Sequence, residues 1–132
     1  ERKVMNYHAR IGYEILHDEQ RSPLTDLAAE IAISHHERWD GSGYPNGLKG
    51  EEIPLSGRIV ALCDVYDALR SPRPYKQAWS AERAQAHIRD NAGGHFDPHL
   101  VQIMSSMFAE LEALQLTMAD RAEPFMLTPL HA

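Results

Sequence analysis

Residues 35–45 read HHERWDGSGYP and mark the point where a helix ends and a glycine-rich loop begins. Before this stretch, apolar residues repeat at intervals of three and four from Leu24 to His35, which is the period of a helix. The segment Asp40–Gly47 is too rich in glycine, proline and asparagine to continue that helix. We therefore predict a helix that ends near His35 and a loop that extends to about Pro54.

The chain after this loop returns to helical patterns. A strongly apolar helix is predicted from Leu55 to Arg70, and Pro72 ends it because the residue before a proline disfavours the helical conformation. Residues 73–76 (RPYK) are then expected to form a stiff, extended connector. A further helix is predicted from an N-cap at Ser80 to about Asn91.

The two ends of the chain complete an all-α prediction. Residues 1–16 have helical spacing, and Asp97 followed by Pro98 is typical of a helix start. The apolar stripe of this last helix consists of Val101, Met104, Phe108 and Leu111. No alternating strand pattern occurs. We expect one all-α domain over residues 1–119 and a loosely ordered tail over 120–132.

Composition restricts the classes of function. The 132 residues carry 13 Lys and Arg against 19 Asp and Glu, a net charge of −6, which argues against binding to nucleic acid polymers. One Cys excludes an intrachain disulfide and a multi-cysteine metal site. No apolar run approaches the roughly 20 residues of a membrane span. The unusual feature is the presence of eight histidines.

Four side chains are candidates for metal binding, and each also has an ordinary structural interpretation. His8 lies on the apolar stripe of the first helix, where a histidine is more often a core residue. His35 and His36 end the second helix, where imidazoles interact favourably with the helix dipole. Asp64 is a carboxylate on the apolar helix, and it could equally face water on a stripe of small residues.

Together these residues favour the metal interpretation. Three histidines and one aspartate on three helices are the donors from which helical domains build imidazole–carboxylate metal sites. Mixed nitrogen and oxygen ligands suit Fe, Mn, Zn, Co or Ni better than Ca. Such a centre activates water and polarises a phosphoryl oxygen, as hydrolysis of a phosphoester requires.

Several motifs together resemble the HD-GYP domains, a branch of the HD metal-dependent phosphohydrolases that hydrolyse the bacterial messenger cyclic di-GMP. Residues 35–45 resemble the HHExxDGxGYP motif of that family. The other matching elements are MNYH (5–8), GRIVALCDVYDAL (57–69), RPYK (73–76) and GHFDP (94–98). The resemblance covers roughly Glu1 to Leu111, and it implies an HD-domain-like helical bundle.

The resemblance also implies roles for individual residues. The metal ligands would be His8, His35, His36 and Asp64, holding two or three divalent transition-metal ions, with Fe or Mn foremost and Zn, Co or Ni as alternatives. Arg73 and Lys76 would contact the phosphates of the substrate, in agreement with the phosphate-binding chemistry of the two side chains. Without the motif, these two residues read as solvent-exposed cations.

The residues that give the family its name would form a loop beside the metal site. In this chain they are Glu37, Asp40, Gly41, Gly43, Tyr44 and Pro45. We expect the two glycines to permit a tight backbone path and the Tyr-Pro pair to pack or to meet a partner domain. Glu37 is left with two interpretations, a carboxylate that supports the metal site or an ordinary surface acid.

The activity implied by the resemblance is a metal-dependent phosphodiesterase that converts cyclic di-GMP to linear pGpG or GMP. An alternative is a catalytically inactive interaction module that docks a GGDEF-type diguanylate cyclase domain. A third reading is an HD phosphohydrolase for another cyclic dinucleotide. We expect the protein to be cytoplasmic and to carry a receiver or sensor domain upstream of this chain. The complete protein could be tethered to a membrane sensor, and it could form a homodimer.

The sequence departs from the family at its N-terminal side. The HDxGK element expected before His8 is absent, so the resemblance assigns no catalytic residue in this chain, and the dipeptide at 17–18 lacks the Gly-Lys sequel. Two explanations are open, a piece of an intact enzyme or a truncated, inactive relative. The absence of an initial Met and of an N-cap favours the first. A bundle without these helices is N-terminally incomplete, and we expect it to expose apolar surface and to associate.

Overall fold

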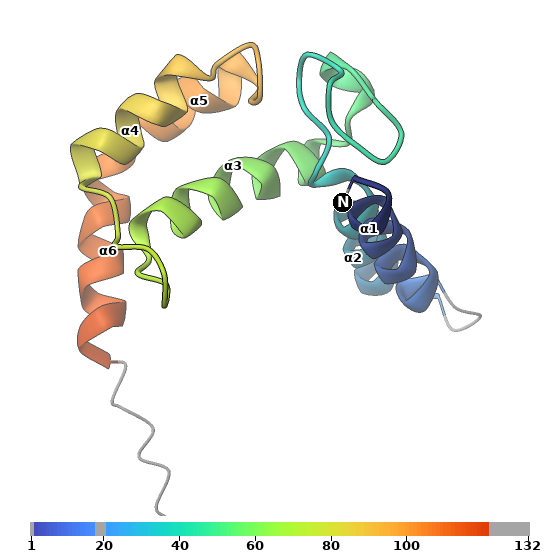
Figure 1. Cartoon of the computed structure of the whole chain (residues 1–132), viewed down its shortest axis with the longest axis horizontal. Coiled ribbons are helices and arrows are strands. Elements are labelled where there is room, and N and C mark those ends of the chain that lie inside the picture. Colours follow the sequence, from blue (N-terminus) through green and yellow to red (C-terminus); the bar gives the residue numbers. More distant parts are fainter. Residues whose placement is uncertain (1, 18–20, 122–132) are drawn as a thin grey trace, which may run out of the picture.

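The computed structural model describes residues 2–17 and 21–121, and within them the protein is built from helices (Figure 1). The only bridges are two isolated residue pairs in these ranges, so the predicted all-α class is confirmed. The elements are α1 (Arg2–Leu16), α2 (Pro23–Ser34), the 3-10 turn η1 (Gly50–Glu52), α3 (Leu55–Arg70), α4 (Ala81–Asp90), α5 (Pro98–Ser106) and α6 (Phe108–Arg121).

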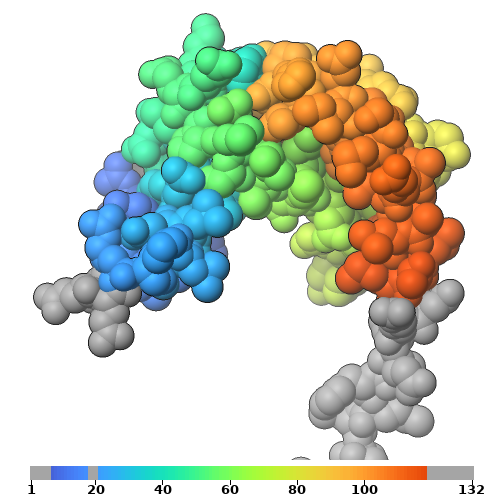
Figure 2. Space-filling model, turned by 180° about the vertical axis from the view of Figure 1, so that it is seen from behind, coloured from blue at the N-terminus to red at the C-terminus, as the bar shows by residue number. Residues whose placement is uncertain are grey.

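The helices are arranged as an arch. The paired helices α1 and α2 form one arm, α3 crosses from that arm to the other side, and α6 forms the second arm (Figure 1). Seen from behind, the two arms enclose an open hollow roofed by α3 (Figure 2). The motif loop between α2 and α3 therefore lies at the junction of the first arm with the roof (Figure 1).

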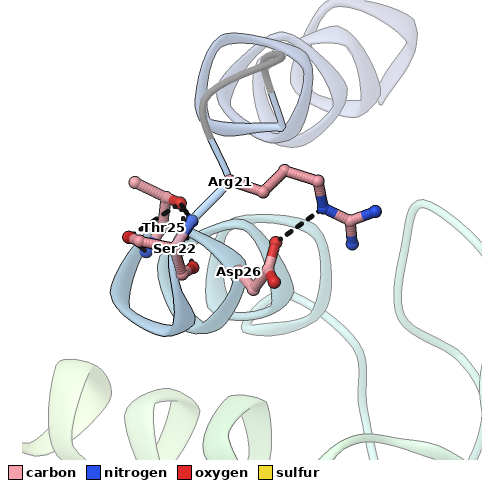
Figure 3. Close-up of polar contacts among 4 residues, drawn as sticks. All are labelled: Arg21, Ser22, Thr25 and Asp26. Carbon is pink, nitrogen blue, oxygen red and sulfur yellow. Dashed lines mark hydrogen bonds and ion pairs between the residues drawn. The ribbon is translucent and has the colours of Figure 1, made fainter.

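The start of α2 shows why the helix begins where it does. Ser22 is its N-cap, with Oγ accepting a hydrogen bond from the Thr25 amide at 3.2 Å, while the Ser22 amide donates to Thr25 Oγ1 at 2.9 Å (Figure 3). Such reciprocal capping satisfies amides that lack partners within the helix. Arg21 pairs with Asp26 at 3.1 Å beside this cap, but both side chains are exposed, so the pair adds little stability.

Helices α1 and α2 meet through small residues. Ala9 is 4% exposed, and a Cβ at Gly12 would lie 3.5 Å from the Ala32 Cβ, which is ordinary van der Waals contact. The apolar stripe on which His8 lies also contains Ile11 and Ile15, but both isoleucines are exposed and do not join a core. Close approach of the two helices selects small side chains for the contact and leaves these larger ones outside it.

Helices α2 and α3 cross in backbone contact at Ser34 and Gly57. Ser34 is 1% exposed, and its Oγ donates to the Glu30 carbonyl at 2.5 Å. A Cβ at Gly57 would lie 2.1 Å from Ser34 Oγ and 2.8 Å from Ser34 Cβ, so only glycine fits. This crossing sets the place of the chain after Ser34 relative to the first turn of α3.

The main core lies where α3, α4, α5 and α6 meet, on the side of α3 away from the hollow (Figure 1). Its buried members are Leu62, Tyr66, Leu69, Ala84, Ile88, Phe96, Val101, Met104 and Phe108. Arg58 closes one end of this core, because Nη1 lies 2.8 Å from Asp97 Oδ2 and Nε donates to the Ile53 carbonyl at 2.8 Å. Asp97 also caps α5, as predicted, by accepting from the His99 amide at 2.9 Å. Burial disfavours the carboxylate, but the Arg58 and backbone hydrogen bonds outweigh it and lower the pKa of Asp97.

Two segments differ from prediction. The expected single C-terminal helix is broken at Met107, whose φ of −108° and ψ of 1° separate α5 from α6. Ser106 Oγ donates to the Ile103 carbonyl at 2.6 Å, which takes up an acceptor at the end of α5. The RPYK segment is a tight turn instead of an extended connector, because Arg73 and Lys76 exchange two backbone hydrogen bonds of 2.8 and 3.0 Å.

The far end of the core is closed by a polar cluster of Arg70, Glu112 and Tyr66. Arg70 Nε and Nη2 lie 2.9 and 2.5 Å from the two Glu112 carboxylate oxygens, and the Tyr66 hydroxyl also contacts that carboxylate. The hydrogen bonds from Arg70 lower the pKa of Glu112 despite burial. The cluster fastens α6 to the last turn of α3.

This cluster makes stability fall in acid. A carboxylate with a lowered folded-state pKa stabilises the fold above its unfolded pKa, near 4.5, and this contribution is lost as the pH falls through the folded value. We expect Glu112→Gln to cost about 2 kcal/mol at pH 7. The variant should also lose less stability than the wild type between pH 5 and pH 3. Urea unfolding at several pH values measures both effects.

Glu110→Gln is the matched control, since Glu110 is exposed on the same helix. Equal acid sensitivity of the two variants would contradict this assignment.

An apolar groove runs along α3, α5 and α6. Its lining residues are Ile59, Leu62, Cys63, Leu100, Ile103, Met104, Met107 and Leu111. Ile59, Ile103 and Met107 are each more than 40% exposed, so the predicted exposure of apolar surface is confirmed. Association of the chain through such surface stays a prediction. No helix in the described part of the chain combines the length and apolar character needed to cross a membrane.

Candidate metal and phosphate site

The histidine pair lies in the turn that directly follows α2. His35 is the C-cap residue, and its Nδ1 lies 2.8 Å from the carbonyl oxygen of Ile31. A carbonyl oxygen only accepts hydrogen bonds, so Nδ1 carries a proton and Nε2 is the ring nitrogen left to face a metal ion. This is the arrangement in which a backbone carbonyl orients a metal-binding histidine. The local geometry therefore fits the predicted ligand role of His35.

His36 is half-buried between two rings. Its imidazole centroid lies 3.9 Å from that of His35 and 5.0 Å from the Tyr44 ring, on which it stacks. Burial lowers the pKa of His36, as do the charges of His35 and His8, while Asp64 acts in the opposite direction. A lowered pKa keeps the imidazole neutral, which is the form that binds metal.

The four predicted ligands are carried by separate segments: His8 lies on α1, His35 and His36 in the turn after α2, and Asp64 on α3. His8 on α1 and Asp64 on α3 are both exposed, so the interpretation of His8 as a core residue is wrong. The stripe of small residues around Asp64 does not simply face water either, because Gly57 and Ala61 are buried.

The donor set has suitable chemistry for a transition metal, with imidazole nitrogens and one carboxylate. Within residues 2–17 and 21–121, however, no group of three or more His, Cys, Asp or Glu side chains is close enough to hold an ion. The ligand roles therefore stay predictions.

The motif loop is held against the segment that precedes α5. The Trp39 amide donates to the His95 carbonyl at 3.0 Å, and the Asp40 amide donates to the Gly94 carbonyl at 2.9 Å. Asp40 Oδ1 accepts from the Ser42 amide and hydroxyl at 2.9 and 2.6 Å, and these bonds lower the pKa of Asp40. Burial and the charge of Arg38 lower the pKa of His95 to about 4. His95 is therefore neutral at pH 7.

The two motif glycines are required for different physical reasons. Gly41 has a φ of 85°, which side chains rarely tolerate. Gly43 lies against the backbone of the preceding turn, where a Cβ would be 2.3 Å from Arg38 N and 2.6 Å from His36 O. The expected tight path is confirmed. Tyr44, which precedes Pro45 through a cis peptide bond, donates its amide to His36 O at 3.2 Å.

Glu37 fastens the loop from inside. Its side chain is 2% exposed, and Oε1 accepts from the Asn46 amide at 2.7 Å while Oε2 accepts from the Leu48 amide at 3.0 Å. The interpretation of Glu37 as a surface acid is therefore wrong. The carboxylate closes the loop that begins beside the histidine pair, so it supports the position of His36 through the backbone.

We expect Glu37→Gln to destabilise the protein by about 2 kcal/mol, because the amide nitrogen that replaces one oxygen would face an amide donor. Thermal unfolding measures the loss. Glu51→Gln, an exposed glutamate in the turn η1, is the control and should change stability by less than about 0.5 kcal/mol. Equal losses in the two variants would contradict the role of Glu37.

The predicted phosphate-binding residues share the turn between α3 and α4. Arg73 and Lys76 are both exposed, at the two ends of a turn with the fully exposed Tyr75 near its tip. The Lys76 ammonium lies 4.8 Å from the centroid of the Trp79 ring. Sequence analysis gave Trp79 no role. Its signal in the sequence is an aromatic residue placed between cations at positions 76 and 83.

Residues 1–100 of the chain match the HD domain family. The chain therefore belongs to the HD domain family, and the resemblance seen in the motifs is confirmed.

Three curated bacterial relatives are named as phosphodiesterases of cyclic dinucleotides. A cyclic di-GMP phosphodiesterase response regulator, RpfG, of Xanthomonas campestris is 50% identical over 86% of this chain and 30% of the relative. A cyclic di-GMP phosphodiesterase of Thermotoga maritima is 46% identical over 83% of this chain and 29% of the relative. The 3'3'-cGAMP-specific phosphodiesterase 2 of Vibrio cholerae is 44% identical over 89% and 22%.

A solved structure has a similar fold. The cyclic GMP-AMP specific phosphodiesterase V-cGAP3 of Vibrio cholerae superposes with a TM-score of 0.67 and 28% identity, over 80% of this chain and 23% of that one. The chain spans less than a third of the length of each of these proteins.

Proposed function

We propose that the protein containing this chain is a metal-dependent phosphodiesterase that hydrolyses cyclic di-GMP to pGpG or GMP. The observation that carries the proposal is the environment of His36. Its ring centroid lies 3.9 Å from that of His35, and the pair stands where the HHERWDGSGYP loop begins, directly after α2. The names of the relatives at 46 to 50% identity support cyclic di-GMP as the substrate.

His8, His35, His36 and Asp64 are proposed to supply part of a site for two or three divalent ions, with Fe or Mn foremost. When bound, such ions activate water and stabilise negative charge on a phosphoryl group. The chain's own contribution is to hold two imidazoles side by side, with the His35 ring oriented by the Ile31 carbonyl. Because the sequence lacks an HDxGK element, we propose that the remaining ligands come from elsewhere in the complete protein.

Arg73 and Lys76 are proposed to bind the phosphates of the substrate. Both cations are exposed on a short turn, and both project from a backbone that is closed by two hydrogen bonds. Arginine provides a planar fork of donors for phosphate oxygens, and lysine provides a compact charge. The chain has a net charge of −6, so two exposed cations on one turn stand out from an otherwise acidic protein as an anion-binding element.

A second substrate, 3'3'-cGAMP, is favoured by a specific observation. One relative is named for that substrate and matches 89% of the chain, and the superposed structure is named for cyclic GMP-AMP. Both substrates share the phosphates that Arg73 and Lys76 would bind, so these two residues do not distinguish them.

The test uses the complete gene product, purified without metal and then loaded with Fe(II) or Mn(II). It is incubated with cyclic di-GMP, 3'3'-cGAMP or linear pGpG, and the products are separated by chromatography. We expect metal-dependent loss of cyclic di-GMP with release of pGpG or GMP. Faster hydrolysis of 3'3'-cGAMP would favour the second substrate. An intact substrate under all metal conditions would overturn the proposal.

The alternative of a docking module is tested in the same preparation. We propose a cytoplasmic protein with an upstream receiver domain, as the name of one relative suggests for that relative. Binding to a GGDEF-type diguanylate cyclase domain that persists without any hydrolysis would support the module instead.

A homodimer is also proposed, and sedimentation at several protein concentrations measures it.

A further inference from the structure

Trp79 lies among cations on the segment that joins α3 to α4. The Lys76 ammonium is 4.8 Å from the centroid of its ring, and the Arg83 guanidinium carbon is 3.8 Å from it. Cations are attracted to the face of an indole ring at these distances. The ring is half-buried and packs against the main core, so it is a fixed platform for groups at the surface.

The backbone of Trp79 is tied to the end of α3. Its amide donates to the Leu69 carbonyl at 2.8 Å, and its carbonyl accepts from Arg70 Nη1 at 2.7 Å. The other donors of Arg70 bind Glu112 on α6. The ring position is therefore set by two helices, and Figure 1 shows this connection beside α6.

The turn that carries Lys76 has weaker support of its own. Two backbone hydrogen bonds close it, but its side chains are exposed, and in the described ranges neither Arg73 nor Lys76 forms an ion pair with an acid. Among the contacts that the structure describes, the Trp79 ring is what orients the Lys76 ammonium. Arg83 brings a second positive charge to the same ring, so a bound anion would be attracted by both side chains.

We propose that Trp79 is a positioning residue that holds the Lys76 ammonium in place for a phosphate of the bound cyclic dinucleotide. The proposal rests on the proposed function, in which Lys76 binds that phosphate. Trp79 itself does not touch the substrate. Its effect on substrate binding therefore passes through Lys76.

The test is a double-mutant cycle in the complete, metal-loaded gene product. The variants are Trp79→Leu, Lys76→Met, the double variant, and Trp79→Phe as the conservative control that keeps an aromatic face. KM and kcat for the cyclic dinucleotide are measured, and thermal unfolding reports the stability of each variant. We expect Trp79→Leu to raise KM about fivefold to tenfold with kcat changed by less than about twofold, in keeping with the strength of a cation–π contact.

The coupling between the Trp79 and Lys76 substitutions shows whether Trp79 acts through Lys76. If Trp79 acts through Lys76, the double variant has the KM of Lys76→Met alone, and Trp79→Phe restores most of the wild-type KM. Additive effects on KM, or a fall in kcat and stability with KM unchanged, would overturn the inference while the proposed function stands. An inactive wild-type protein would overturn the proposed function and, with it, the inference.

Discussion

Replacing Gly43 by alanine is expected to destabilise the protein by about 3 kcal/mol, because an inserted methyl group with no room to relax forces the backbone apart. The new Cβ would lie 2.3 Å from Arg38 N and 2.6 Å from both Glu37 Cα and His36 O. All three atoms belong to the backbone of the turn that holds the histidine pair, so no side chain can move aside. Urea unfolding measures the loss.

The control for Gly43→Ala is Gly94→Ala, in the segment on which the motif loop docks. A Cβ at Gly94 would meet its nearest neighbour, Asn91 O, at 3.8 Å, which is ordinary contact. We expect this variant to change stability by less than about 0.5 kcal/mol. A Gly43→Ala protein as stable as the control would show that the turn before the loop can shift without cost.

The Asp64→Asn variant of the complete gene product is expected to lose at least about 100-fold in phosphodiesterase activity, equivalent to about 2.7 kcal/mol. The substitution keeps the shape of the side chain and removes the negative charge that a divalent ion requires. The same variant should bind less metal than the wild type, which elemental analysis of the purified protein measures. Because Asp64 is exposed, we expect its thermal unfolding to be nearly unchanged.

Asp67→Asn is the matched control for this prediction. Asp67 is an exposed aspartate on the same helix, and its carboxylate lies 3.4 Å from the Ser71 hydroxyl at the helix end. Removing its charge should leave metal content and activity within about twofold of wild type, as expected for a surface substitution. Equal loss in both variants would point to a general effect of charge on α3 and against a ligand role for Asp64.

Local signals in the sequence predict the helices well. The apolar period and Pro72 place α3 at Leu55–Arg70, as observed, and the capping side chains of Ser80 and Asp97 mark the starts of α4 and α5. Each of these signals acts within one or two turns of the chain. This is why they can be read without knowledge of the fold.

Signals that depend on contacts between segments were missed. The apolar stripe through Val101, Met104 and Phe108 keeps its spacing across the break at Met107, so periodicity alone does not reveal two helices. The outward position of Ile15 depends on how α1 approaches α2.

The candidate site shows the same division. The candidate ligands and the segments that carry them could be proposed from the sequence, but the distances between them depend on the crossing of α2 and α3 at Ser34 and Gly57. The burial of Glu37 also depends on a loop that returns nine and eleven residues later.

The way the motif loop is fastened limits how far its sequence can be transplanted. Only some of the hydrogen bonds that hold residues 35–45 in their conformation are formed between residues of this stretch. The carboxylate of Glu37 accepts hydrogen bonds from two backbone amides that lie after residue 45. The loop also donates backbone hydrogen bonds to the carbonyls of Gly94 and His95. If the eleven residues were grafted onto another helical hairpin, the sequence would be transferred but the loop would not adopt this conformation. A designer who wants this histidine pair must therefore also import the segment before α5 as a backbone template.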